Sequence, residues 1–99
     1  MIIAIDYDET YTKDPILWDA FIKNAISRGH TVYCVTARGE KYGGDEVKQD
    51  LANLVHGCYF TDGKQKEKFM LQNNIFVHVW IDDCPLSIVD KSMKESWEE

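Results

Sequence analysis

Four short apolar runs alternate with helix-like stretches along the chain, and this alternation is the feature that most limits how it can fold. The runs cover residues 2–5, 30–36, 57–61 and 75–81. Strands that alternate with single helices predict βαβ units and a parallel sheet. The sequence therefore predicts an α/β fold: a three-layer Rossmann-like sandwich with a parallel sheet of four or five strands and helices on both faces.

Residues that favour helix ends predict where helices start and stop between the apolar runs. Asp14 followed by Pro15 predicts the start of a first helix, because a carboxylate cap and an early proline both favour that position. Gly29 predicts its end. A second helix is expected from Asp45 and a third over 66–73. The expected inward-facing residues are Leu17, Phe21, Ala25 and Ile26 in the first helix, Val47, Leu51, Leu54 and Val55 in the second, and Phe69 and Met70 in the third.

The C-terminal segment is open to two interpretations. Leu86, Ile88 and Val89 could add a short fifth strand, and the segment up to Trp97 has helical character at its end. Ninety-nine residues can bury one core but not two. We therefore expect a single domain that spans residues 1–99.

Composition and charge exclude several classes of protein. The formal net charge of −6 argues against a broad basic surface for nucleic acid. The chain has no apolar run of 18 residues, and its start lacks the basic region of a signal peptide, so a cytoplasmic location is expected. Cys34, Cys58 and Cys84 are too widely spaced for a zinc site or a disulfide framework, and we expect reduced, mostly buried thiols.

Acidic and hydroxyl residues stand where the predicted strands end. Asp6 ends the first run, Thr36 the second, and Asp82 and Asp83 follow the fourth. The carboxyl ends of parallel strands meet in one crevice, where such folds bind ligands. Two carboxylates about 4 Å apart repel by about 1 kcal/mol in water and about 4 kcal/mol near a protein surface. A hard divalent cation such as Mg²⁺ would relieve that repulsion.

The order of these residues suggests phosphoryl transfer through a covalent intermediate. Asp6 could attack phosphorus, which splits one difficult displacement into two easier ones. Asp8, two residues later, could protonate the leaving group and then deprotonate water.

Four segments resemble the motifs of the haloacid dehalogenase (HAD) superfamily, in the order of that family. They are "IAIDYDET", "VYCVTAR", "DGKQKEKF" and "HVWIDD". The resemblance covers most of the chain and implies a Mg²⁺-dependent phosphohydrolase. The resemblance implies that Asp6 is the nucleophile and a metal ligand, and that Asp8 is the general acid and base and binds the metal through its backbone carbonyl. It also implies that Thr10 supports the loop, that the hydroxyl of Thr36 donates a hydrogen bond to the phosphoryl group, and that a lysine lies beside the phosphate. Asp82 is then a direct metal ligand, and Asp83 binds the metal directly or through water.

Two side chains near these motifs have more than one interpretation. The motif lysine could be Lys66, in the first turn of the third helix, or Lys64, in the preceding loop, with Lys68 a third choice. Arg38 follows the second motif closely, and its guanidinium suits phosphate or carboxylate, so it either contacts substrate or has a surface role.

The chain departs from the family in two respects. Glu9 stands where many members have glycine, which allows unusual backbone angles, and a solvent-facing Glu9 is expected. Only one helix fits between Thr10 and Thr36, and almost nothing fits between the third strand and Lys66, so there is no room for a cap. This short capless pattern resembles small phage and bacterial members. It implies an open site for a small phosphate ester, a nucleic-acid end or a phosphoprotein, or a site that a second copy completes.

Two other classes of function compete with the hydrolase. A regulatory or binding module would keep the fold and the phosphate or metal site but turn over little. A receiver-like signalling domain also clusters acids around Mg²⁺, but it would carry its acid pair after the first strand rather than after the fourth.

Overall fold

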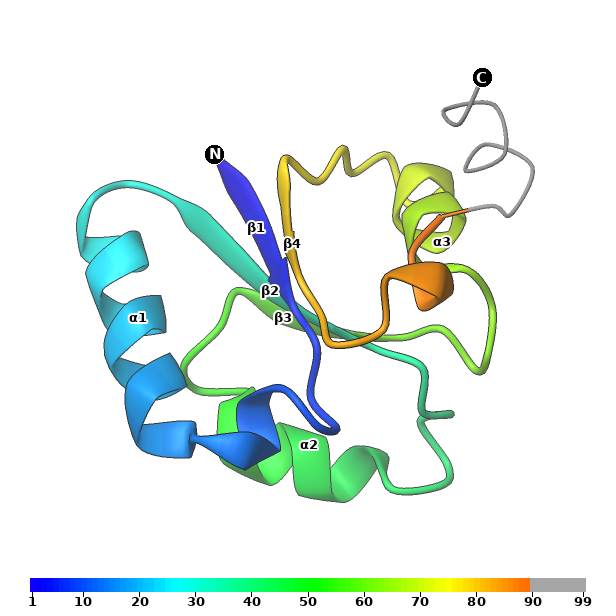
Figure 1. Cartoon of the computed structure of the whole chain (residues 1–99), viewed down its shortest axis with the longest axis horizontal. Coiled ribbons are helices and arrows are strands. Elements are labelled where there is room, and N and C mark those ends of the chain that lie inside the picture. Colours follow the sequence, from blue (N-terminus) through cyan, green and yellow to red (C-terminus); the bar gives the residue numbers. More distant parts are fainter. Residues whose placement is uncertain (90–99) are drawn as a thin grey trace.

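The computed structural model describes residues 1–89 and forms an α/β fold (Figure 1). Its elements in chain order are β1 (Ile2–Ile5), the 3₁₀-helix η1 (Tyr11–Lys13), α1 (Pro15–Ser27), β2 (Thr31–Thr36), α2 (Gly44–Leu51), β3 (Gly57–Phe60), α3 (Lys66–Gln72), β4 (Val79–Ile81) and the 3₁₀-helix η2 (Pro85–Ser87). Within the described residues, no helix has the length and apolar character needed to cross a membrane.

The four strands form one parallel sheet with the order β3-β2-β1-β4. Ile5 in the central strand pairs with Cys34 on one side and with Ile81 on the other. After β3 the chain crosses to the opposite side of β1, so the strand order reverses between β1 and β4. This layout is compatible with a Rossmann-like fold. A receiver-like order would instead place β3 next to β1.

Helices cover both faces of the sheet, as the alternation predicts. Ile3 and Ile5 face α1 and α2, where they pack with Ile22 and Val47, whereas Ala4 faces α3 and packs near Met70. Figure 1 shows α1 and α2 together on one side and α3 on the other. Successive residues of β1 therefore point to opposite helical layers, and this alternation decides which way Asp6 points.

The predicted start of α1 is confirmed. Asp14 caps the helix, and its Oδ1 accepts a hydrogen bond of 3.1 Å from the backbone N–H of Leu17. The inward position expected for Leu17 is wrong, because its side chain is 53% exposed. The residues of α1 that pack against the core are instead Trp18, Phe21, Ile22, Ala25 and Ile26. These residues recur at helical spacing, and Leu17 lies outside the face that they form.

The other differences from prediction lie at element ends. β4 starts at Val79 rather than at Ile75. The N–H of Ile75 bonds to the carbonyl of Met70, which closes the turn after α3 instead of joining the sheet. α2 ends at Leu51, and Leu54 and Val55 pack from the turn that follows.

No fifth strand forms over residues 86–89. Pro85 starts η2 in this segment, and the N–H of Ile88 bonds to the carbonyl of Pro85. The helical character expected up to Trp97 lies beyond residue 89, outside the described residues.

Candidate active site

Asp6 lies at the point where the strand order reverses. Its backbone N–H donates to the carbonyl of Ile81 at 2.9 Å, which continues the β1–β4 pairing by one residue. Because side chains alternate along β1, Asp6 lies on the same face as Ala4 and points towards α3. The side chain is buried, with only 7% of the residue exposed.

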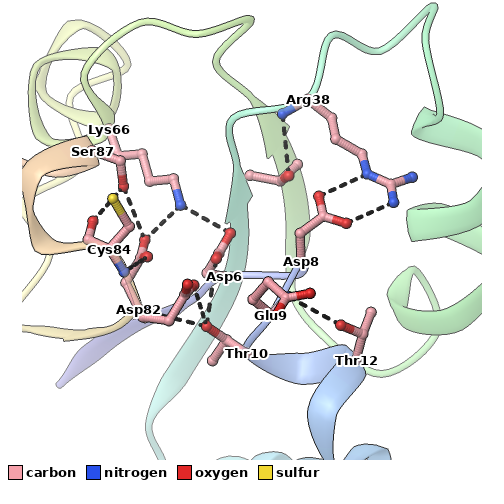
Figure 2. Close-up of polar contacts among 12 residues, drawn as sticks. Asp6, Asp8, Glu9, Thr10, Thr12, Arg38, Lys66, Asp82, Cys84 and Ser87 are labelled. Atoms are coloured by element: carbon pink, nitrogen blue, oxygen red, sulfur yellow. Dashed lines mark hydrogen bonds and ion pairs between the residues drawn. The ribbon is translucent and has the colours of Figure 1, made fainter.

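Lys66, the first residue of α3, joins the carboxylates of β1 and β4. Its Nζ lies 2.9 Å from Oδ1 of Asp6 and 2.5 Å from Oδ2 of Asp82. The three side chains are almost completely buried, with exposed fractions of 2% for Lys66, 9% for Asp6 and 2% for Asp82. Figure 2 shows the ammonium group between the two acids. Of the candidate lysines, Lys66 is thus the one whose ammonium group contacts Asp6.

Burial and pairing act in opposite directions on these groups. Burial raises the pKa of Asp6 to about 6, although the hydrogen bond from Lys66 opposes the rise. Burial also lowers the pKa of Lys66, but the hydrogen bonds to Asp82 and Asp6 outweigh it, so the net shift is upward. Lys66 is therefore a cation at neutral pH, and its hydrogen bond favours the ionised form of Asp6.

Thr10 connects Asp6 to the second acid after β4. Its hydroxyl lies 3.0 Å from Oδ1 of Asp83 and 3.4 Å from Oδ2 of Asp6, and its Oγ1 accepts the backbone N–H of Asp83 at 3.1 Å. Thr10 is buried at the base of the loop. The predicted supporting role of Thr10 thus has a structural counterpart, a bridge between the loop after β1 and the end of β4.

Asp6, Asp82 and Asp83 form a group suited to a hard cation. Each offers a carboxylate oxygen, and the three oxygens lie within 4.8 Å of one another. Lys66 pairs with two of the three acids, Asp6 and Asp82, so the three carboxylates, when ionised, carry two negative charges more than its ammonium offsets. An oxygen-only donor set with this excess fits a divalent cation of the Mg²⁺ or Ca²⁺ type, although Lys66 already shares two of the acids.

Asp8 has a different cationic partner, Arg38. The guanidinium forms a two-pronged ion pair, with Nε 2.9 Å from Oδ2 and Nη2 2.7 Å from Oδ1 of Asp8. This pairing holds the pKa of Asp8 below its usual range. Asp8 and Asp6 are thus only two residues apart but belong to separate ionic clusters (Figure 2).

Several residues that hold Arg38 were not foreseen from the sequence. Its Nη1 donates to Glu46 and to the carbonyl of Gly43, each at 2.9 Å, and the guanidinium lies 4.9 Å from the ring centre of Tyr7. Tyr7 is buried, and its hydroxyl donates to Oδ2 of Asp50 at 2.5 Å. An acid in the first turn of α2, near a loop arginine, was the available sequence signal for Glu46.

The Lys66 cluster consists of Lys66, Asp6 and Asp82, and Thr36 and Lys64 are not members of its ion pairs. Thr36 is fully buried, and its Oγ1 accepts the backbone N–H of Arg38 at 3.2 Å. Lys64 is exposed in the turn before α3 and lines a groove with Lys68 and Phe69. Of the three cysteines, Cys34 is buried and Cys58 half-buried, but Cys84 is exposed, contrary to expectation.

Glu9 is exposed, as expected, and adopts the backbone conformation that favours glycine. Its φ is +62°, and its carboxylate forms an exposed ion pair with Lys13 at 3.1 Å. The loop after β1 therefore keeps a glycine-like bend at this position, and the backbone N–H of Glu9 donates to Oγ1 of Thr12 at 3.1 Å (Figure 2).

Comparison of the chain with protein-family models, with curated proteins and with solved structures finds no match. Membership of the HAD superfamily accordingly stays a prediction from the four motifs.

Replacement of Lys66 by Met should destabilise the fold by about 3 kcal/mol, because it leaves buried carboxylates without their cation. Urea denaturation at pH 7 without divalent ions measures the change. The matched control is Lys64→Met, which removes an exposed lysine and should alter the unfolding free energy by less than about 0.5 kcal/mol. Equal losses in the two variants would contradict the structural role of the Lys66 cluster.

Replacement of Glu9 by Gly should stabilise the protein by up to about 1.5 kcal/mol, since a non-glycine residue in the left-handed region costs about 1–2 kcal/mol and glycine loses about 0.5–1 kcal/mol in chain entropy. Thermal and urea unfolding report the difference. Glu9→Gln keeps the side chain but removes the charge, and it should change stability little. A gain of equal size in Glu9→Gln would assign the effect to charge rather than to the backbone.

Proposed function

We propose that this protein is a Mg²⁺-dependent phosphohydrolase of the capless HAD type, acting through an aspartyl-phosphate on Asp6. The observation that carries the proposal is the convergence of Asp6, Lys66 and Asp82 from β1, α3 and β4. A buried lysine held between two acids at the carboxyl ends of parallel strands suits phosphoryl transfer, because charge on a phosphoryl group needs fixed cations.

Asp6 supplies the nucleophile in this proposal. Its Oδ1 is bonded to Lys66, whereas Oδ2 accepts only a long contact of 3.4 Å from Thr10 and is the more available oxygen. A bond forms between this oxygen and phosphorus as the bond from phosphorus to the leaving oxygen breaks, and the leaving oxygen takes a proton from Asp8. A water molecule then gives its proton to Asp8 and attacks phosphorus, which releases phosphate and restores Asp6.

Asp6, Asp82 and Asp83 are the side chains that would hold the metal ion. A divalent cation bound by them would offset the negative charge that gathers on the phosphoryl oxygens. Lys66 lies beside the same carboxylates and adds its own charge to that offset, while Thr10 keeps Asp83 in place.

The short connections around the site support an open, capless arrangement. Between Thr10 and Thr36 the chain forms η1 and α1, and between β3 and Lys66 it makes a turn of five residues, 61–65. A phosphorylated small molecule, a nucleic-acid end or a phosphoprotein could reach such a site, and a second copy of the chain could complete it.

A catalytically weak phosphate- or metal-binding module is the alternative, and the state of Asp8 favours it. Both carboxylate oxygens of Asp8 accept hydrogen bonds from Arg38, which keeps the group ionised and without a proton to give. A hydrolase must release Asp8 from this pair, whereas a binding module need not.

Substitution of Asp6 by Asn should lower phosphate release from p-nitrophenyl phosphate, with Mg²⁺ present, by about 10³-fold or more, because it removes the nucleophile. Chelation of the metal should abolish release as well. Asp45→Asn, an exposed carboxylate in the first turn of α2, is the matched control and should retain full activity.

A wider assay distinguishes the hydrolase from the binding module. A panel of phosphate esters, including nucleotides and oligonucleotides phosphorylated at the 3′ or 5′ end, should contain at least one substrate of a hydrolase. Equal activity of wild type and Asp6→Asn would reject the aspartyl-phosphate route. Calorimetric binding of phosphate ligands without turnover across the panel would favour the binding module.

A further inference from the structure

The site contains two cations that differ sharply in how firmly they are held. The Lys66 cluster is buried, as described above. The Arg38 cluster is open to solvent, with exposed fractions of 22% for the side chain of Arg38, 50% for Asp8 and 62% for Glu46. Exposed ion pairs add little net stability, because water solvates the separated charges well. The pair between Arg38 and Asp8 can therefore be broken and re-formed far more easily than the pairs of Lys66.

Most hydrogen-bond donors of Arg38 are already bonded within the protein. A guanidinium has five N–H donors, and four of them bond to Asp8, Glu46 and the carbonyl of Gly43. Any anionic ligand that binds this guanidinium through both prongs must displace one of these partners.

Arg38 is also held in position by contacts that do not involve Asp8. Gly43 has a φ of +96°, and a Cβ added there would lie 2.7 Å from Nη1 of Arg38, so glycine leaves room for the guanidinium. Glu46 and the ring of Tyr7 hold the same group from the α2 side. Loss of Asp8 as a partner therefore leaves Arg38 with three contacts that keep it beside the site.

Asp8 is the partner that a phosphate would replace. Its carboxylate accepts the paired Nε and Nη2 donors, which is the geometry that a guanidinium also offers to two phosphate oxygens. Asp8 follows Asp6 by two residues, so Arg38 reaches the same loop as the proposed nucleophile.

We propose that Arg38 exchanges partners when a phosphoryl group binds: the phosphate takes the two donors that hold Asp8, and Asp8 is released towards the leaving group. This inference rests on the proposed function, and it assigns to Arg38 a positioning role. In the unliganded protein the pair keeps Asp8 out of the reaction, and a phosphorylated ligand removes that restraint.

A double-mutant cycle on the binding of inorganic phosphate tests the exchange. Calorimetry with saturating Mg²⁺ compares wild type, Asp8→Asn, Arg38→Gln and the double variant. Removal of the competitor in Asp8→Asn should raise phosphate affinity about fivefold, and the same change in the Arg38→Gln background should raise it less than about twofold. Equal increases in the two backgrounds would mean that Asp8 merely repels phosphate, and would overturn the proposal.

A second comparison leaves Arg38 in place. Glu46→Gln removes an anion from the same guanidinium but not the partner that phosphate replaces, so it should raise phosphate affinity less than about twofold, against the gain of about fivefold for Asp8→Asn. Glu40→Gln, at an acid that pairs with Lys48 instead, measures the effect of overall charge. Equal gains in Asp8→Asn and Glu46→Gln would reduce the result to overall charge and contradict the exchange. This comparison tests the exchange even if Arg38→Gln does not fold.

Measurements of ester hydrolysis and of phosphate binding test the proposed function and this inference separately. Coupling between Asp8 and Arg38 in phosphate binding, without hydrolysis of any ester, supports the exchange and rejects the hydrolase. Hydrolysis with no coupling supports the hydrolase and rejects the exchange. Wild-type protein that binds no phosphate in the presence of Mg²⁺ rejects the exchange outright.

Discussion

The ammonium group of Lys66 between Asp6 and Asp82 is the contact on which the arrangement of the site depends. Two parallel strands, β1 and β4, end side by side in acids that would repel one another in a buried setting. Lys66 offsets that repulsion from the first residue of α3. The helix is held in this position by Met70 on the α3 face of the sheet and by a bond from the N–H of Glu67 to the carbonyl of Ile88. The packing of α3 against the sheet thus also positions the cation that offsets the negative charges at the strand ends.

A second ionic cluster, around Arg38, has the opposite character. It is exposed, it draws on the loop after β2 and on α2, and it holds the loop after β1 through Asp8. Buried pairs fix geometry because an unpaired buried charge is costly, whereas exposed pairs exchange readily with water and with other ions. The site therefore combines a rigid part next to α3 with an adaptable part next to α2, and a phosphate ligand would meet both.

The layers of the fold followed from local patterns. The run at residues 2–5 becomes β1 and is apolar on both faces, as a sheet covered on both sides requires. The run at 30–36, which is rich in β-branched residues, contains β2. The cap at Asp14 set the start of α1. Local patterns were less informative where tertiary contacts compete. Ile75 bonds to Met70 instead of extending β4, and Leu17 is turned outward by the face that α1 presents to the sheet.

By itself the sequence determined that Asp6, Thr36 and Asp82 would lie at one edge of the sheet, because the carboxyl ends of parallel strands share an edge. The position of β4 next to β1, which brings Asp82 beside Asp6, was decided by the tertiary structure. The sequence could not determine which cation would join these two acids, since Lys64 and Lys66 are both close in sequence to the end of β3. The orientation of α3 against the sheet decided for Lys66. Nor could it show that Arg38 would bind Asp8, thirty residues away. Such pairings depend on how loops and helices lie against one another, and that geometry is set by packing across the whole molecule rather than by neighbouring residues.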